Sequence, residues 1–449
     1  MTAPESVTQR LAEWASQLTY DQIPAEVRRE ARRCLLDYLG VTLGAADEDA
    51  PRIARQTAEL LGGNAQATIL GTTQKTSLVQ AALVNGIASH VLDFDDTHII
   101  TVLHPTGPAM SGALPVAEWQ HASGRDLITA FIAGFEVEAR IALSICPEHY
   151  DRGWHVTGSV GMFGAAAAAG RLMGLDAHQM NMALGIAASQ PTGLREQFGT
   201  MTKSLHSGKT ASNGVQSAIM ASLGYTASEK ALEALRGFCN VVSDKQDYAP
   251  IVEKLGESWE VFGNGIKPYS CGVVIHPSVD AVREMRNKHR LTADKVQSIH
   301  ARVHPLVLEL TSKRNLKVGL EGKFSVFYAM AVALVEGTAR QRQFSDDLVV
   351  RPDLVELYGK IDATADDAIR QEESEVTATL TDGSQLVVHV PWATGTPQNP
   401  ISDEDLEAKF RDLVGPYISE SAADQTISIV KALDDLNDVG TIAQLVSRS

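Results

Sequence analysis

The sequence predicts a mainly α protein with a large all-helical domain and a smaller α+β domain. Three observations support this fold class. Apolar residues recur at helical spacing through the first two thirds of the 449 residues, alternation typical of strands begins after Gly265, and helical spacing returns from about Asp403. We therefore predict a helical domain formed by residues 1–267 together with 401–449, and an α+β domain at 268–400.

The helical part begins with an amphipathic pattern. Val7, Leu11, Trp14 and Leu18 fall on one face of a helix. Residues 76–92 are apolar nearly all round, which predicts a buried helix. Further helices are expected at 110–122, 126–144, 159–173, 176–189 and 209–223. The stretch Gly164–Gly170 holds only Gly and Ala, so we interpret it as a place where helix backbones pack closely.

The α+β part shows strand patterns at residues 298–304, 374–380 and 385–390. Asp382-Gly383 lies between the last two strands and predicts a two-residue hairpin turn. Helices expected at 278–289 and 324–336 would cover the sheet.

Composition narrows the function classes. There are 39 basic and 55 acidic residues, so the net charge is −16, which argues against binding nucleic acid or an anionic membrane. The four cysteines form no CxxC pair, which argues against a disulfide scaffold or a cysteine zinc site. The apolar stretches are too short for a membrane span. These features lead us to expect a cytoplasmic protein.

Common cofactor and nucleophile motifs are absent from the sequence. There is no GxGxxG after a strand, no GxxxxGK[ST], no GxSxG and no HExxH. This argues against a nicotinamide, flavin or nucleotide enzyme.

The most unusual segment runs from His90 to His104. It holds three histidines and three aspartates within fifteen residues, at the end of an apolar helix. Such a group could bind a divalent metal ion, or it could perform acid–base chemistry with Asp93 orienting a histidine. Alternatively, some members, Asp96 and His98 in particular, could cap helices or hold a turn.

Three later segments add imidazole and positive charge. His155 precedes the small-residue helix. Lys203 lies ahead of another helix, and because helix starts attract anions it could hold a carboxylate. Lys267 and His276 lie where the helical part gives way to the mixed domain, and domain junctions are preferred places for clefts.

Taken together, these segments resemble the MmgE/PrpD family along nearly the whole chain. The matching pieces are Cys34-Leu-Leu-Asp-Tyr-Leu-Gly40, Ala88-Ser-His90, Asp93-Phe-Asp-Asp-Thr97, His104-Pro105, His155, Phe198-Gly-Thr-Met-Thr-Lys203, Leu205-His206, Lys267-Pro-Tyr269, His276-Pro277 and Lys323-Phe-Ser325. The resemblance implies a helical domain plus an α+β domain, a homodimer, an active site in the cleft between the domains, and no metal ion or organic cofactor.

The resemblance is greatest to the decarboxylase branch of the family. By that resemblance the catalytic residues are Asp93, Thr97, His104, His155, Lys203 and His276, although the spacer between Thr97 and His104 is longer here. Residues expected to bind the substrate carboxylates are Lys203, Lys267, Arg195 and Tyr269.

The implied activity is that of a cofactor-independent lyase on a small di- or tricarboxylic acid, most similar to the members that decarboxylate cis-aconitate. Proton transfer next to a carboxylate is the shared chemistry. His104 and His155 would carry protons, with Asp93 orienting one of them and Thr97 bonding the substrate. A 2-methylcitrate-type dehydratase, an epimerase of an iminodisuccinate-like acid and a non-catalytic carboxylate-binding protein are the alternatives.

Overall fold

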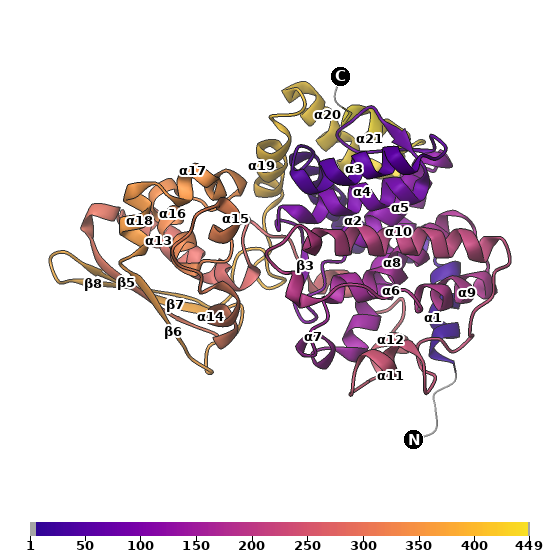
Figure 1. The fold of residues 1–449 in the computed structure, drawn as a ribbon, viewed down its shortest axis with the longest axis horizontal. Helices are drawn as coiled ribbons and strands as arrows, with labels where there is room; N and C mark the ends of the chain where they lie inside the picture. Colours follow the sequence, from indigo (N-terminus) through magenta and orange to yellow (C-terminus); the bar gives the residue numbers. More distant parts are fainter. Residues whose placement is uncertain (1–5, 448–449) are drawn as a thin grey trace. The chain divides into compact units, whose positions relative to one another are not determined.

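The chain folds into two compact units. The computed structural model describes residues 6–447, so the outermost residues of the predicted helical domain, 1–5 and 448–449, lie outside the described part (Figure 1). The first unit contains the chain up to Val91, Asp95–Asn264 and the chain from Asp403 onward. The second unit contains Leu92–Phe94 and Gly265–Ser402. In sequence, the second unit thus interrupts the first twice.

The first unit is built from helices, and the predicted mainly α fold class is confirmed. Short strand pieces also occur at β1 (Ala67–Thr68), β2 (Lys75–Thr76) and β3 (Thr97–His98), and β4 (Asn264–Gly265) ends the long central segment. The helices are α1 (Val7–Gln17), α2 (Ala25–Gly44), α3 (Asp49–Leu61), α4 (Leu78–Val91), α5 (Thr106–Trp119), α6 (Gly124–Ile145), α7 (Glu148–Asp151), α8 (Val156–Leu172), α9 (Ala177–Ala187), α10 (Thr202–Ser222), α11 (Phe238–Val242), α12 (Ala249–Val252), α19 (Asp403–Val414), α20 (Glu420–Lys431) and α21 (Gly440–Leu445).

Helix α8 packs through its small residues, as predicted. A Cβ atom on Gly134 of α6 would lie 2.5 Å from the carbonyl oxygen of Gly164, and one on Gly214 of α10 would lie 2.6 Å from that of Met162. Real Cβ atoms do not approach this closely, so larger side chains would push the backbones apart. The small residues therefore allow α6, α8 and α10 to pack at short range.

Helix α10 begins at Thr202, seven residues before the predicted start at Lys209. Its first half contains several Ser and Thr residues and Gly208, which are weak helix formers, so the sequence pattern did not indicate the true start. Packing overrides that preference, because a Cβ atom on Gly208 would lie 2.2 Å from the carbonyl oxygen of Leu83 in α4. Lys203 and His206 consequently lie inside the helix.

The C-terminal helices are joined to the N-terminal part of the first unit by a buried ion pair. Lys409 of α19 lies 2.6 Å from Asp37 of α2, and both side chains are almost fully buried. Residues 403–447 therefore complete the first unit. Among residues 6–447, no helix has the length and apolar character needed to cross a membrane.

The second unit is a four-stranded sheet with helices. The strand order is β6-β5-β7-β8, with β5 parallel to β6 and antiparallel to β7. On β5, Ile299, Ala301 and Val303 are buried and contribute to the apolar core with α13 and α16. The elements are α13 (His276–His289), β5 (Val296–Val303), α14 (Pro305–Thr311), α15 (Gly319–Gly322), α16 (Val326–Glu336), α17 (Asp346–Val349), α18 (Pro352–Tyr358), β6 (Ile361–Ala365), β7 (Ser374–Leu380) and β8 (Gln385–Val390).

The β7–β8 connection differs from the predicted two-residue turn. The Leu380 N–H donates to the carbonyl of Ser384, so the bond encloses three residues, Thr381 to Gly383. Gly383 has a φ of 86° and supplies the left-handed residue that three-residue hairpins need. Strand β6 was not predicted, because Ile361-Asp-Ala-Thr-Ala is short and largely exposed.

Candidate active site

Four histidines gather inside the first unit, and we call His90, His104, His155 and His206 the imidazole cluster. The ring centroids of His90 and His104 are 4.6 Å apart, and those of His90 and His155 are 5.5 Å apart. His206 lies 5.2 Å from His155 by the same measure. All four residues are buried. The cluster therefore joins His104 and His155, which the sequence analysis selected, to two further imidazoles.

Helix termini position three members of the cluster. His90 lies in the last turn of α4, His104 lies two residues before α5, and His155 is the N-cap residue of α8. His206 comes from the second turn of α10, where Gly158 and Gly193 leave room for its side chain. Functional side chains commonly lie where a rigid element meets a loop, and this arrangement fits that pattern.

Hydrogen-bond acceptors in the segment from His90 to His104 fix the orientation of the His90 and His104 rings. The Nδ1 atom of His90 lies 2.7 Å from a carboxylate oxygen of Asp95. The Nδ1 atom of His104 lies 2.7 Å from the backbone carbonyl of Asp96 and 3.4 Å from the Thr97 hydroxyl. Because carbonyls and carboxylates only accept, both Nδ1 atoms carry the proton, which leaves each Nε2 with a lone pair when the ring is neutral.

Burial keeps His155 and His206 neutral. Their Nδ1 atoms lie 2.9 Å apart, so one donates to the other. Burial, with the nearby positive charge of Lys203, lowers the pKa of His155 well below 6.5 and that of His206 to about 4. Among the described residues, the Nε2 atoms of His90 and His155 have no hydrogen-bond partner.

Asp96 and His98 have structural contacts in this unit. The Asp96 carboxylate accepts hydrogen bonds from the Thr106 hydroxyl at the start of α5 and from the Asn264 side chain. Burial raises the pKa of Asp96 to about 7. His98 is fully buried and bonds to Thr101. These contacts agree with the alternative that some members of the segment hold the turn before α5.

Two cationic residues lie on the segment that leads into α10. Lys203 is half-buried in the first turn of α10, and its ammonium lies 5.5 Å from the Phe198 ring centre. Its charge acts on His155 and His206. Arg195 instead stacks on the Tyr150 ring at 3.9 Å and donates to the Tyr150 carbonyl. Of these two cations, Lys203 is thus the one coupled to the imidazole cluster.

The remaining predicted site residues belong to the second unit. The Lys267 ammonium lies 2.8 Å from the Asp93 carboxylate and also donates to the Asp93 carbonyl. Both side chains are buried, and Asp93 has a φ of 52°, a left-handed conformation that Asp tolerates better than most residues. Lys323 donates to the neighbouring carbonyl of Leu92. We call Asp93, Lys267 and Lys323 the lysine–aspartate cluster.

His276 and Tyr269 contact each other in the second unit. Their rings meet edge to face with centroids 5.2 Å apart. The Nε2 atom of His276 lies 3.2 Å from the Cys271 carbonyl. The Tyr269 hydroxyl donates to Asp280 and accepts from Arg283. The tyrosine thus links the start of α13, where His276 lies, to polar residues one turn further on.

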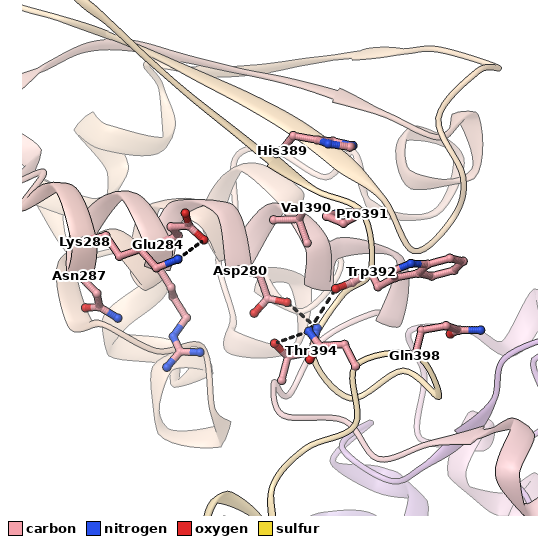
Figure 2. Close-up of a pocket in the computed structure, with 12 residues that line it drawn as sticks. Asp280, Glu284, Asn287, Lys288, His389, Val390, Pro391, Trp392, Thr394 and Gln398 are labelled. Carbon is pink, nitrogen blue, oxygen red and sulfur yellow. Dashed lines mark hydrogen bonds and ion pairs between the residues drawn. The ribbon is translucent and has the colours of Figure 1, made fainter.

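A surface hollow of about 490 Å³ opens beside Asp280 in the second unit (Figure 2). Residues of α13 and of the segment after β8 line it, among them Lys288, Trp392 and Thr394. Asp280 accepts from the Thr394 N–H there. None of the residues selected from the sequence lines this hollow.

The structure distributes the predicted residues between two groups. Thr97, His104, His155 and Lys203 come together in the first unit, and Asp93 with Lys267, and Tyr269 with His276, form pairs in the second. The sequence analysis assigned no individual role to His90, which it considered only as part of the segment from His90 to His104, and none to His206 or Lys323. The signal was present, since each lies within a segment that carries the family resemblance.

These features define a class of two-unit protein. A mainly helical unit contains a buried imidazole cluster, and the same chain also forms a smaller α+β unit. Residues 9–251 match the MmgE/PrpD N-terminal domain, and residues 269–435 match the MmgE/PrpD C-terminal domain. The chain belongs to the MmgE/PrpD family, and the resemblance inferred from its motifs is confirmed.

Similar proteins of this family are enzymes. A cis-aconitate decarboxylase from Aspergillus terreus is 29% identical, over 99% of this chain and 96% of the relative. The human cis-aconitate decarboxylase is 28% identical, over 98% and 95% of the two chains. A 2-methylcitrate dehydratase from Cupriavidus necator is 25% identical over 79% of each chain. The family and a decarboxylase- or dehydratase-type role are thus supported.

Proposed function

We propose that this protein is a cofactor-independent lyase that decarboxylates a small di- or tricarboxylic acid resembling cis-aconitate. The observation that carries the proposal is the imidazole cluster, in which the buried, neutral rings of His155 and His206 feel the charge of Lys203. A neutral imidazole can accept a proton from solution and then pass it on as an imidazolium. The similarity to cis-aconitate decarboxylases over nearly the whole chain supports the same reaction class.

Lys203 would bind a substrate carboxylate, because its ammonium is the charge coupled to the cluster. In the reaction, the bond between the substrate carbon and one carboxyl carbon breaks, carbon dioxide leaves, and the electron pair stays on the substrate. Positive charge stabilises the resulting anion, most strongly where water is excluded. An imidazolium then delivers one proton to that carbon, so each turnover consumes one proton from solution.

His104 is our proposed proton carrier. Its Nδ1 atom is held by the Asp96 carbonyl, which points the Nε2 atom away from that anchor. His155 would serve as the second carrier, with His206 as its hydrogen-bond partner. Thr97, whose hydroxyl lies beside His104, would bond the substrate. A positioned proton carrier contributes about 10²–10⁴-fold to a rate.

We propose roles in the same reaction for the predicted residues of the second unit. Lys267, held by Asp93, would bind a further carboxylate, and His276 would complete the site. Tyr269 would act through its ring, because its hydroxyl is bonded to Asp280 and Arg283. Arg195 would assist in carboxylate binding only after leaving Tyr150. A homodimer in the cytoplasm remains our expectation from the family resemblance.

Dehydration is the second candidate, favoured by the match to the 2-methylcitrate dehydratase. Dehydration differs in its first step: one imidazole abstracts a proton from the carbon next to a carboxylate, and the hydroxyl group then leaves as water after it has been protonated. An epimerase would use two of the imidazoles as paired acid and base, without net bond cleavage.

Incubation of the purified protein with cis-aconitate, 2-methylcitrate and iminodisuccinate tests these functions. We expect release of carbon dioxide from cis-aconitate. Formation of an alkene from 2-methylcitrate, seen by ultraviolet absorbance, would favour the dehydratase, and deuterium exchange without net reaction would favour the epimerase. Binding of any of these acids with no turnover would favour a non-catalytic protein and contradict the proposal.

A further inference from the structure

One backbone segment, Leu92–Thr97, is held by two different sets of hydrogen bonds. Its first three residues belong to the second unit, and the rest belong to the first unit. In the later part, the Asp95 carboxylate accepts from the Nδ1 atom of His90, and the Asp96 carbonyl accepts from that of His104. The segment that orients these two rings therefore begins among residues of the second unit.

Three side chains surround the Leu92 carbonyl, and we call Lys323, Ser270 and Gln341 the carbonyl clamp. The Lys323 ammonium donates to this carbonyl and lies 2.7 Å from the side-chain oxygen of Gln341. The Ser270 hydroxyl lies 3.1 Å from the same carbonyl and 2.8 Å from the same Gln341 oxygen. Lys323 and Ser270 are almost fully buried. Because hydrogen bonds from charged donors are stronger than neutral ones, Lys323 is the main support of the carbonyl.

Asp93 adopts a backbone conformation that needs such support. Its φ of 52° lies in the left-handed region, which costs free energy in residues other than glycine and persists where the surroundings fix it. On one side, the Lys267 ammonium lies 3.2 Å from the Asp93 carbonyl and 2.8 Å from its carboxylate. On the other side, Lys323 holds the Leu92 carbonyl. Two consecutive carbonyls thus accept from two buried ammonium groups, one on each side of the left-handed residue.

We propose that Lys323 is a positioning residue that orients the imidazole cluster through the Leu92–Thr97 segment. By holding the first carbonyl of the segment, Lys323 fixes the left-handed turn at Asp93. Asp95 and Asp96 follow that turn within three residues, so the direction of the turn decides where their acceptor oxygens lie. Loss of the ammonium lets the turn relax toward an ordinary conformation and displaces both acceptors.

The consequence for the reaction rests on the proposed function, in which His104 carries the proton. Displaced acceptors would no longer hold the Nδ1 protons of His90 and His104, so the lone pair of each Nε2 atom would lose its direction. A displacement of about 1 Å that starts far from the reacting atoms can cost about 10²-fold in rate. Lys203, which would bind a substrate carboxylate, lies on α10 and outside this segment. The proposal therefore concerns the rate of proton transfer and not the affinity for substrate.

Lys323→Met tests the effect on the reaction, because it keeps the length of the side chain and removes the donor. We expect kcat with cis-aconitate to fall by about 10²-fold and KM to change little. Lys360→Met is the matched control, since it removes a half-exposed ammonium of the same unit that pairs with Glu356. This control should keep the wild-type kcat and KM.

Nitrogen-15 NMR of labelled imidazoles tests the positioning without reference to turnover. In the wild type, we expect His90 and His104 to carry a hydrogen-bonded proton on Nδ1, and in Lys323→Met we expect both signals to shift or broaden. His149 is the internal control, because its Nδ1 atom bonds to the Val242 carbonyl and its signals should not change. Substitution of each histidine in turn by glutamine assigns the signals.

Circular dichroism and the thermal midpoint establish that each variant is folded. If the His90 and His104 signals of folded Lys323→Met match the wild type, Lys323 only supports the second unit and the proposal is wrong. If the signals shift but kcat does not fall, the positioning is supported and the proton-carrying role of His104 is contradicted instead. If Lys323→Met does not fold, Gln341→Met decides the question. This variant removes the acceptor shared by Lys323 and Ser270, so unchanged ring signals in it contradict the proposal.

Discussion

The two units bury polar side chains in opposite ways. In the first unit, His155 and His206 of the imidazole cluster avoid the cost of burying a charge, because burial lowers the pKa of both rings and keeps them neutral. In the second unit, two members of the lysine–aspartate cluster form an ion pair, with the Lys267 ammonium at 2.8 Å from the Asp93 carboxylate. The comparison teaches that the first arrangement suits the movement of a proton, whereas the second suits the holding of a fixed charge.

The largest expected effect concerns His104, the proposed proton carrier in the imidazole cluster. We expect His104→Ala to lower kcat by about 10²–10⁴-fold with cis-aconitate, because a positioned imidazole is lost. His121→Ala, which removes an exposed histidine, should retain wild-type kcat. Steady-state kinetics with both folded proteins measure the difference. Normal turnover in His104→Ala would remove this residue from the mechanism.

Removal of one charge from the lysine–aspartate cluster tests whether Lys267 and Asp93 form a fixed ion pair. Lys267→Met leaves Asp93 buried without its ammonium, and we expect the second unit to lose about 3–5 kcal/mol of unfolding free energy. Hydrogen exchange of the β5 and β7 amides measures this loss. The matched double variant Asp93→Asn/Lys267→Met removes both charges and should recover part of the stability. Equal destabilisation of the two variants would contradict the fixed-pair interpretation.

The pH dependence of stability distinguishes the neutral cluster from the charged one. Burial lowers the pKa of His206 from 6.5 to about 4, so the unfolded chain binds a proton before the folded chain does. Stability from this group is present above pH 6.5 and is lost as the pH falls toward 4. His206→Gln should therefore reduce the slope of the thermal midpoint between pH 6.5 and 4. An unchanged slope would show that the ring titrates normally in the folded protein.

The smallest expected effect concerns the support of His276. Tyr269→Phe keeps the ring contact with His276 but removes the hydroxyl that bonds Asp280 and Arg283. We expect a loss of about 1 kcal/mol, measured by hydrogen exchange of the α13 amides. KM for cis-aconitate should change little, because the ring remains in place. A large rise in KM would instead assign the hydroxyl to substrate binding.

Local patterns predicted the fold class well. Alternation at Val376 and Ala378 located β7, and the Gly/Ala stretch of α8 predicted close helix packing. Where tertiary packing overrides local preference, the sequence was less informative. The start of α10 was missed because Gly208 is a poor helix former that is needed beside Leu83.

The candidate site was predictable only in part. His104 and His155 were selected through the family resemblance, and they lie in one cluster. His90 was considered only as part of the segment from His90 to His104, and His206 received no role, because sequence spacing does not show which rings become neighbours in the fold. The distances that join His206 to His155 depend on the packing of α8 and α10, which sequence spacing does not reveal.

The Asp37–Lys409 ion pair has a consequence for the order of folding during synthesis. A ribosome makes α2 early and α19 only after all of Gly265–Ser402. The smaller unit can therefore mature on the nascent chain while the larger one still lacks its last helices. Until Lys409 emerges, Asp37 has no ammonium from α19, so chains truncated before residue 403 should depend on chaperones and be degraded rapidly.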